Sequence, residues 1–205
     1  MYGNLEDGQT NTTSKLQAQT NTNDSTIKAY LDNWYTTNLA SYETYISDTL
    51  FCNDRTIQET IPDGYSNLGY GKEKTAYRTS SSDNGIKLMC QEQNDRFTVN
   101  DESMGNGDLT HPIGLLTTDE AYLAGGYTLL SNRAYYLYTG NVYWTMSPSR
   151  FSGSYANVEG VDLNGYAVSG NCVHYSDVGV RPTINLKSGT LKKGSGLASD
   201  PWMVE

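Results

Sequence analysis

The sequence predicts one α+β domain, in which two or three helices pack on a twisted, mainly antiparallel sheet with long irregular loops. Three observations carry this prediction. Apolar residues recur with helical spacing between residues 27 and 35. They alternate in the manner of a strand between residues 135 and 146, and apolar pairs separated by turn residues follow up to residue 186. A chain of 205 residues can bury one core of ordinary size.

The chain is acidic, with 14 Lys and Arg against 23 Asp and Glu, a formal net charge of −9 and a pI near 4.6. Because there is no basic field, neither nucleic acid nor an anionic membrane surface is an expected partner. Tyrosine is far commoner than phenylalanine, 17 against 3. The excess of phenolic hydroxyls favours amphipathic rings at a binding surface, although tyrosine is also common along ordinary β-strands.

Composition divides the chain into three segments. Residues 1–24 consist mostly of small, polar and charged residues and predict a flexible polar tether. Residues 25–190 form the predicted domain, and residues 191–205 a C-terminal tail.

No stretch has the roughly 20 apolar residues of a membrane span, and the residues after Met1 lack the basic and apolar regions of a signal peptide. We expect either a cytoplasmic or phage-borne protein, or an extracellular or cell-surface fragment whose signal or anchor lies upstream.

A first helix is predicted to begin at Asp24–Ser25, because either side chain can cap the free amides, and to end near Asn38. Its apolar face is expected to pack on the sheet, with Trp34 in the core. The residues of this face are Ile27, Tyr30, Leu31, Trp34 and Tyr35. A second helical period, at Leu39, Tyr42 and Ile46, precedes an extended segment over Leu50–Cys52.

Residues 53–84 have the composition of a loop, and short strands are predicted at Ile86–Cys90 and Phe97–Val99. Another helix is predicted to begin at Thr117–Glu120, because a hydroxyl caps its first turn and acidic residues complement the helix dipole. Gly125–Gly126 is expected to end it. A strand pattern follows, at Tyr135, Leu137, Val142, Trp144 and Met146.

The remaining residues predict a β-meander. Apolar residues at Val158, Val161, Ala167 and Val168 are separated by turn residues, and Asn164–Gly165 favours a type I′ hairpin turn. Val178–Leu186 is expected to close the sheet, with Pro182 at an edge or a bulge. In the tail, Trp202 is the residue that could dock back on the domain.

The segment YWTMSP at Tyr143–Pro148, followed by GVRPTINL at Gly179–Leu186, resembles a bacterial and phage family of C-type-lectin-like domains. The upstream LTTDEAYLAGG is similar to the helix that precedes this pattern in the family. The resemblance covers Ser25 to Leu186 and implies a C-type-lectin-like fold. Related proteins include formylglycine-generating-enzyme-like proteins and the variable proteins of diversity-generating retroelements, in which a C-terminal β-surface is mutated while the scaffold stays fixed.

The resemblance to variable proteins implies a display surface between Arg150 and Asp177. Mutagenesis at adenines of AAY codons never produces Lys, Gln, Glu, Met or Trp, and Glu159 is the single residue of these types in the segment. Ordinary turn chemistry predicts a similar composition, so both interpretations stay open. The candidate ligand-binding residues are Arg150, Phe151, Ser154, Tyr155, Asn157, Asp162, Asn164, Tyr166, Asn171, His174 and Tyr175.

The three cysteines allow one disulfide. In an oxidising compartment Cys52 and Cys90 are the favoured pair, because both lie at strand-like positions of the scaffold; the alternative is two buried thiols. Cys172 is left over. Formylglycine-generating relatives use a cysteine pair near the C-terminus for copper-dependent oxidation, and only Cys172 lies in that region, which argues against this enzyme.

No metal or cofactor is expected. Cys172 and His174 supply two ligands, whereas zinc sites need three or four, and the calcium motifs of true C-type lectins are absent from the sequence. Arg181 is expected to be partly buried and paired with an acid. Arg150 is the better placed cation for a ligand.

These observations favour a non-enzymatic recognition or adhesion domain, which binds a protein or glycan through the hairpins between Arg150 and Asp177. One alternative is a structural subunit of a surface fibre or pilus, with the Tyr-rich surface as the subunit contact. Another is an oxidoreductase of the formylglycine-generating type.

Overall fold

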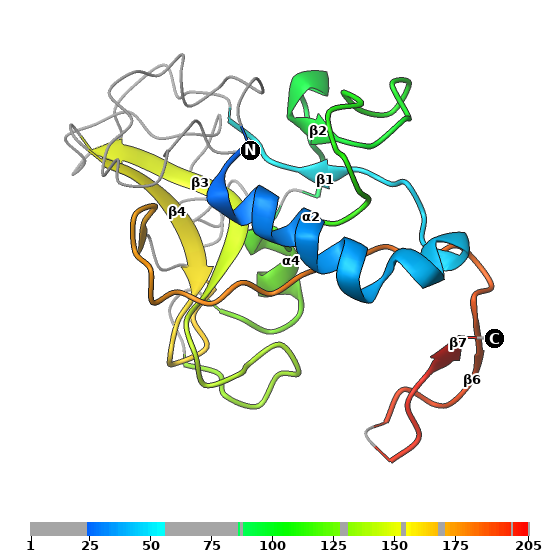
Figure 1. Cartoon of the computed structure of the whole chain (residues 1–205). Helices are drawn as coiled ribbons and strands as arrows, with labels where there is room; N and C mark the ends of the chain where they lie inside the picture. Colours follow the sequence, from blue (N-terminus) through cyan, green and yellow to red (C-terminus); the bar gives the residue numbers. More distant parts are fainter. Residues whose placement is uncertain are drawn as a thin grey trace.

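The computed structural model describes residues 24–55, 86, 88–127, 131–152, 155–167, 171–197 and 199–204, with the side chains of 150–152, 155, 156 and 172 left out (Figure 1). The predicted tether, most of the loop 53–84, Ser154 and Val168 lie outside these residues.

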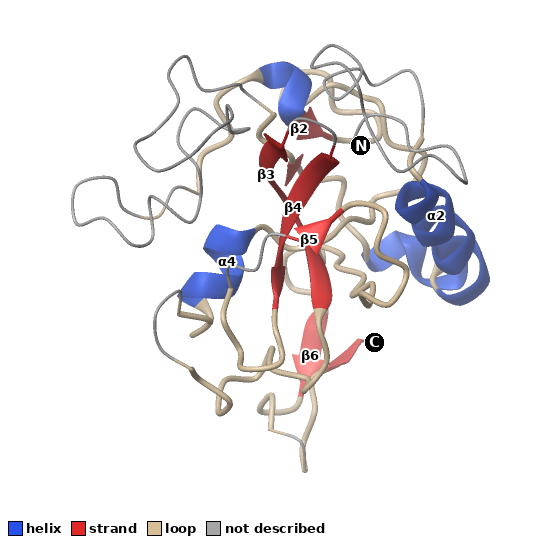
Figure 2. Ribbon diagram, turned by 90° about the vertical axis from the view of Figure 1, so that its left-hand side faces the viewer, coloured by secondary structure: helices blue, strands red, loops and turns tan. Residues whose placement is uncertain are grey.

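The main sheet has three antiparallel strands in the order β3 (Tyr143–Ser152), β4 (Tyr155–Val161) and β5 (Asn171–Cys172). The register of β3 against β4 shifts on either side of Pro148, a residue that cannot donate to the ladder. In Figure 2 these strands run down the middle of the molecule, with helix α4 on one side and helix α2 on the other. Each face of the sheet is therefore covered by a different helix.

Helix α2 (Thr26–Asn38) covers one face and begins where predicted, with the Ser25 hydroxyl accepting a hydrogen bond from the Lys28 amide. Leu31 and Tyr35 are buried, whereas Tyr30 is 52% exposed. Trp34 is half-buried at the margin of the core. The core on this face consists of Leu31, Tyr35, Ile46, Phe51, Phe97, Leu109, Ile113, Leu115, Trp144, Met146 and Val158.

Helix α4 (Thr118–Leu123) covers the opposite face and confirms the predicted helix start. The Thr117 side chain accepts from the Glu120 amide while the Glu120 carboxylate accepts from the Thr117 amide, a complete capping box. Gly125 follows with a φ of 115°, a conformation that other residues rarely adopt. A smaller core forms beneath this helix from Ala121, Tyr135, Leu137, Tyr143, Val161 and Ala167.

A second, two-stranded sheet pairs β1 (Phe51–Cys52) with β2 (Arg96–Phe97). The sulfur atoms of Cys52 and Cys90 form a disulfide beside it, with the two Cα atoms 5.6 Å apart. This is the pair that the sequence favours for an oxidising compartment. The strand predicted at 86–90 is wrong for its described residues, 86 and 88–90. The Cys90 carbonyl accepts from the Arg96 guanidinium (2.7 Å), so a side chain takes the place of a ladder partner.

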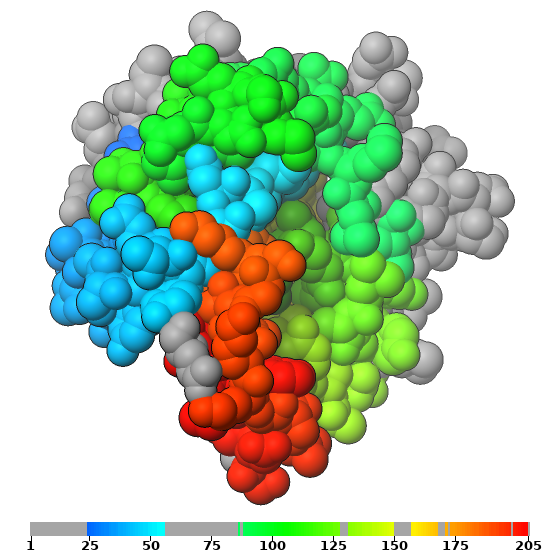
Figure 3. All heavy atoms as spheres, turned by 90° about the vertical axis from the view of Figure 1, so that its right-hand side faces the viewer, coloured from blue at the N-terminus to red at the C-terminus, as the bar shows by residue number. Residues whose placement is uncertain are grey.

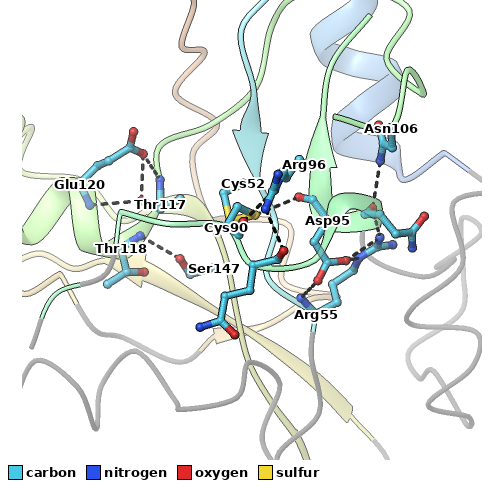
Figure 4. Close-up of a disulfide and its surroundings, with 12 residues drawn as sticks. Cys52, Arg55, Cys90, Asp95, Arg96, Asn106, Thr117, Thr118, Glu120 and Ser147 are labelled. Carbon is cyan, nitrogen blue, oxygen red and sulfur yellow. Dashed lines mark hydrogen bonds and ion pairs between the residues drawn. A yellow bond between two sulfur atoms is a disulfide. The ribbon is translucent and has the colours of Figure 1, made fainter. Parts of the chain in front are cut away.

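A buried ion pair lies beside the disulfide (Figure 4). Arg55 is 1% exposed, and its Nε donates to Asp95 Oδ1 (2.9 Å) while its backbone amide donates to Oδ2 (2.8 Å). The guanidinium also lies over the Phe97 ring, 5.1 Å from the centroid. Burial raises the pKa of the Asp95 carboxyl, and the Arg55 amide and charge act in the opposite direction. Sequence inspection missed this pair.

The segment 178–186 does not form the closing strand that was predicted. It makes isolated bridges to three different elements instead, Gly179 with Tyr143, Thr183 with Gly114 and Leu186 with Ile46. The physical reason is that no single neighbour runs beside it: the Gly179 amide donates to Val142, and the Thr183 amide to Gly114. The segment thus connects β3 to Gly114, which precedes α4, and to Ile46, which follows α2.

Three further predictions differ from the structure. The second helical period forms a short 3-10 helix, η1 (Ala40–Tyr45). Tyr135 and Leu137 are buried but belong to a turn, in which the Tyr138 amide donates to the Tyr135 carbonyl (3.0 Å), so the strand begins only at Tyr143. The expected tail contains a hairpin of β6 (Leu191–Lys193) and β7 (Met203–Val204).

Candidate functional site

The predicted display surface separates into buried and exposed parts. Asn157 is 4% exposed and lies inside β4, where residues 157–161 are all buried, so the structure places it in the interior and not on the predicted display surface: both faces of the sheet are covered at this point. Asp162, Asn164, Tyr166 and Asn171 are half-buried, and His174 and Tyr175 are exposed. Arg150, Phe151 and Tyr155 lie on the paired ends of β3 and β4, where only the backbone is described.

The first exposed element is the turn that follows β4, residues 162–166. The Asp162 Oδ1 accepts hydrogen bonds from the amides of Asn164 (2.8 Å) and Tyr166 (2.9 Å), and the Asp162 carbonyl accepts from the Gly165 amide (3.1 Å). Gly165 has a φ of 80°, while no described non-glycine residue has a positive φ. The predicted type I′ turn is therefore wrong, because that turn needs positive φ at both central residues.

The loop 131–138 supports this turn from outside. Its Arg133 guanidinium donates to the Asn164 side chain (2.5 Å), the Ser131 hydroxyl to the Asn164 carbonyl (2.9 Å) and the Tyr138 hydroxyl to the Leu163 carbonyl (3.1 Å). A Cβ atom at Gly165 would lie 1.9 Å from a backbone oxygen of this loop. Such close support fixes the turn before any ligand arrives.

Sequence inspection missed the residues of this supporting loop. Tyr136 in this loop is 79% exposed, and Leu163 in the turn is 55% exposed. The hydrogen bond from the Tyr138 hydroxyl to the Leu163 carbonyl joins the loop to the turn. The surface therefore extends beyond the predicted boundary at Arg150. The sequence feature that could have indicated this loop is the polar run Ser131-Asn132-Arg133, since such residues favour side-chain hydrogen bonds to nearby backbone.

The second exposed element is the turn that follows β5, residues 173–177. His174 and Tyr175 have their rings edge to face, with centroids 5.1 Å apart and an angle of 77° between the planes. Tyr175 is 46% exposed. An edge-to-face pair holds each ring while leaving ring surface open to solvent, which suits both stacking on a sugar and packing against a protein.

Behind these turns, the face of the sheet toward α4 carries buried polar side chains. The Thr118 hydroxyl lies 3.0 Å from that of Thr145, and the Ser147 hydroxyl accepts from the Thr118 amide (2.9 Å; Figure 4). The Thr145 hydroxyl donates to the Glu159 carbonyl (2.8 Å). These groups bind one another and the backbone, so they attach α4 to the sheet and do not form a nucleophile–base pair.

Arg181 is half-buried, as predicted, but it forms no ion pair with an acid among the residues that the structure describes. Its guanidinium donates to the Leu137 carbonyl (2.5 Å) and lies over the Tyr143 ring, 5.4 Å from the centroid. A carbonyl and an aromatic face together satisfy the charge without a carboxylate. The Tyr143 hydroxyl donates to the same Leu137 carbonyl (3.1 Å). Arg181 therefore holds the turn at 135–137 against β3.

No family model, curated protein or solved structure matches the chain. The site's own geometry therefore carries the functional argument. Within the residues that the structure describes, no group of three or more His, Cys, Asp or Glu side chains could hold a metal ion. None of the helices in the described part of the chain is long and apolar enough to cross a membrane.

Proposed function

We propose that this chain is a non-enzymatic recognition domain of a cell or phage surface, which binds an external protein or glycan. The proposed surface consists of the turns 162–166 and 173–177 and the loop 131–138. The observation that carries the proposal is the support of the turn 162–166: its backbone is held from within by Asp162 and from outside by Arg133, Ser131 and Tyr138.

This support matters because a rigid turn loses little conformational entropy when a ligand binds. Tyrosine side chains on such a frame offer large contact areas with only two rotatable side-chain bonds. The exposed rings of Tyr136 and Tyr175 fit that role. The disulfide between Cys52 and Cys90 adds support for an oxidising, extracytoplasmic setting.

A paired substitution tests the proposal. Tyr175→Ala and Tyr42→Ala remove the same ring at similar exposure, 46% and 52%, but Tyr42 lies on η1, away from the turns. Wild type and both variants are applied to a glycan array and to an array of purified extracellular proteins. We expect wild type and Tyr42→Ala to bind the same ligand, and Tyr175→Ala to lose about tenfold or more in affinity, as at a tyrosine hot spot.

Two results would overturn the proposal. One is the absence of binding by wild type to either array. The other is an equal loss of affinity in the two variants, which would mean that the turn 173–177 has no special part in recognition. Thermal unfolding of each variant checks that the substitution leaves the fold intact, as is usual for an exposed side chain.

A further inference from the structure

The C-terminal hairpin exposes an unusual amount of apolar surface. Every residue of β6 and β7 is exposed, and the two strands pair only with each other. Leu197 is 63% exposed and Trp202 53%. A two-stranded hairpin is marginally stable in water, and clustered apolar side chains on a surface mark an interaction site. We call residues 187–204 the basic hairpin.

The name reflects its charge, which is opposite to that of the rest of the chain. Residues 187–204 contain three lysines, Lys187, Lys192 and Lys193, and one aspartate, Asp200, a net charge of +2 that becomes +1 with the following Glu205, on a chain whose net charge is −9. The Lys187 amine donates to the Thr44 carbonyl (2.8 Å) and attaches the hairpin to η1. A surface that is both basic and apolar fits an acidic, partly apolar partner.

Such a surface exists on the same protein, at residues 88–108, which we call the acidic cap. It contains five acids against one cation, Arg96; because Asp95 pairs with Arg55, the other acids exceed the cation by three charges. Asp95 is buried against Arg55, while Glu92, Glu102 and Asp108 are exposed. Exposed apolar side chains lie among them: Leu88 at 63%, Met89 at 76% and Met104 at 54%.

The acidic cap has a fixed backbone. The Asp48 carboxylate accepts hydrogen bonds from the amides of three successive residues, 99–101, at 2.8 to 3.2 Å. The Gln93 side chain donates to the Glu102 carbonyl (2.8 Å) and joins the two halves of the cap. Hydrogen bonds from Ser103 and Met104 lower the pKa of the Asp101 carboxyl, so this charge persists into acid.

The two surfaces lie at opposite ends of the molecule. In Figures 1 and 2, strand β2 of the cap is at the top, whereas β6 is at the bottom. The space-filling view in Figure 3 shows the same separation for the later part of the cap, whose bright-green atoms lie toward the top while the C-terminal residues lie lowest. A protein with complementary surfaces at its two ends can bind further copies of itself in a row.

We propose that the basic hairpin of one molecule docks on the acidic cap of a second copy of the same chain, which gives head-to-tail association. Such a contact is heterologous, so it leaves a free hairpin at one end and a free cap at the other, and it grows until the row closes or the subunits run out. The contact uses neither turn of the proposed recognition surface. The two proposals therefore stand or fall separately.

Sedimentation of the wild-type protein gives the first test. We expect the weight-average mass to rise beyond that of a dimer as the concentration approaches about 1 mM, which populates contacts with millimolar dissociation constants. Raising the ionic strength is expected to reverse the rise, because exposed charges are screened. A wild-type protein that stays monomeric over this range would overturn the proposal.

Two complementary variants give the decisive test. The hairpin variant carries Lys192→Glu and Trp202→Ser, and the cap variant carries Glu102→Gln and Met104→Ser, so that the two altered surfaces are not complementary to each other; all four side chains are exposed. Each variant alone keeps one intact surface and is expected to be monomeric, with its self-association weakened about tenfold or more. An equimolar mixture is expected to form heterodimers and nothing larger, since only one of the two possible contacts is intact.

Other modes of self-association predict different results for these variants. If two hairpins paired through a two-fold axis, the cap variant would dimerise alone, which contradicts head-to-tail docking. Self-association of the hairpin variant alone, or a mixture that stays monomeric, contradicts it as well. Leu123→Ser, at a residue 57% exposed on α4, is the control and should associate like wild type. Circular dichroism and the unfolding midpoint confirm that every variant is folded.

Discussion

Asp95 and Asp162 both accept hydrogen bonds through their carboxylates, but these bonds have different structural roles. Asp95 is 5% exposed and accepts from both the backbone and the guanidinium of Arg55. Asp162 is half-buried and accepts from the backbone amides of Asn164 and Tyr166. Around Asp95 the hydrogen bonds satisfy a polar group that is buried inside the scaffold. Around Asp162 they fix a turn whose side chains stay available to solvent.

The difference predicts that substitutions in the two regions have effects of very different size. Removing one partner of a buried ion pair leaves the other charge buried and unpaired, which lowers the free energy of unfolding far more than the loss of an exposed contact does. A turn held by a half-exposed carboxylate can instead let water replace the lost acceptor. Stability should therefore depend on the scaffold, and ligand binding on the turns.

The largest effect is expected for Arg55→Ala. The Asp95 carboxylate would remain buried without the guanidinium that pairs with it, so the free energy of unfolding should fall by about 3 to 5 kcal/mol. Urea unfolding followed by tryptophan fluorescence measures the loss. The double variant Arg55→Met, Asp95→Leu removes both charges and fills a similar volume, and it should lose much less. Equal losses in the two variants would show that packing, and not charge, explains the effect.

The disulfide should contribute somewhat less. Cys52 and Cys90 are separated by 38 positions in the sequence, and replacing both by Ala is expected to lower the free energy of unfolding by about 2 to 4 kcal/mol through the added entropy of the unfolded chain. Adding a reductant to wild type should produce the same loss. The reductant should have no further effect on the double variant; if it does, another sulfur of the chain contributes to stability.

A smaller effect is expected in the turn. Asp162→Ala removes the acceptor of two backbone amides and should cost about 1 kcal/mol, because water can reach the exposed side of the turn. Asp162→Asn keeps a side-chain oxygen in place and should lose about half as much. Chemical denaturation measures both losses. A loss in Asp162→Ala as large as that of Arg55→Ala would contradict the distinction between scaffold and turn.

The local signals of the sequence predicted the helices well, because capping and helical spacing act within a few residues. Ser25 and Thr117 cap the helices as expected, and Gly125 ends α4. The disulfide pair that the sequence favours is also the one in the structure. The C-type-lectin-like fold and the recognition function remain predictions, since no comparison tests them.

Contacts between distant segments were not predictable in the same way. Nothing near Arg55 in the sequence indicates a buried guanidinium, because Asp95 lies 40 residues away. Asn157 was assigned to the surface because its segment has a turn-like composition, whereas β4 is covered on both faces and its residues 157–161 are buried. The segment 178–186 resembles a strand in composition, but its backbone partners lie on three separate elements.

The smallest effect at neutral pH is expected at Tyr135, in the core beneath α4. Its hydroxyl is buried without a well-formed hydrogen bond among the described residues, so Tyr135→Phe should change the free energy of unfolding by no more than about 0.5 kcal/mol at pH 7. Burial, followed by the neighbouring Tyr143, raises the pKa of Tyr135 above its ordinary value. Burial likewise raises the pKa of Tyr143.

A raised pKa means that the folded protein favours the neutral phenol. The stabilisation is complete below the pKa of the unfolded chain, about 10, and is lost as the pH rises through that value toward the folded pKa. Stability of wild type should therefore fall above about pH 10, whereas Tyr135→Phe should fall less steeply, with Tyr143 and Tyr35, whose pKa values burial also raises, contributing to what remains. Urea unfolding between neutral pH and pH 11 measures both slopes. Identical slopes would show that Tyr135 ionises as readily in the folded protein as in the unfolded chain, which would place its hydroxyl in water and not in the core.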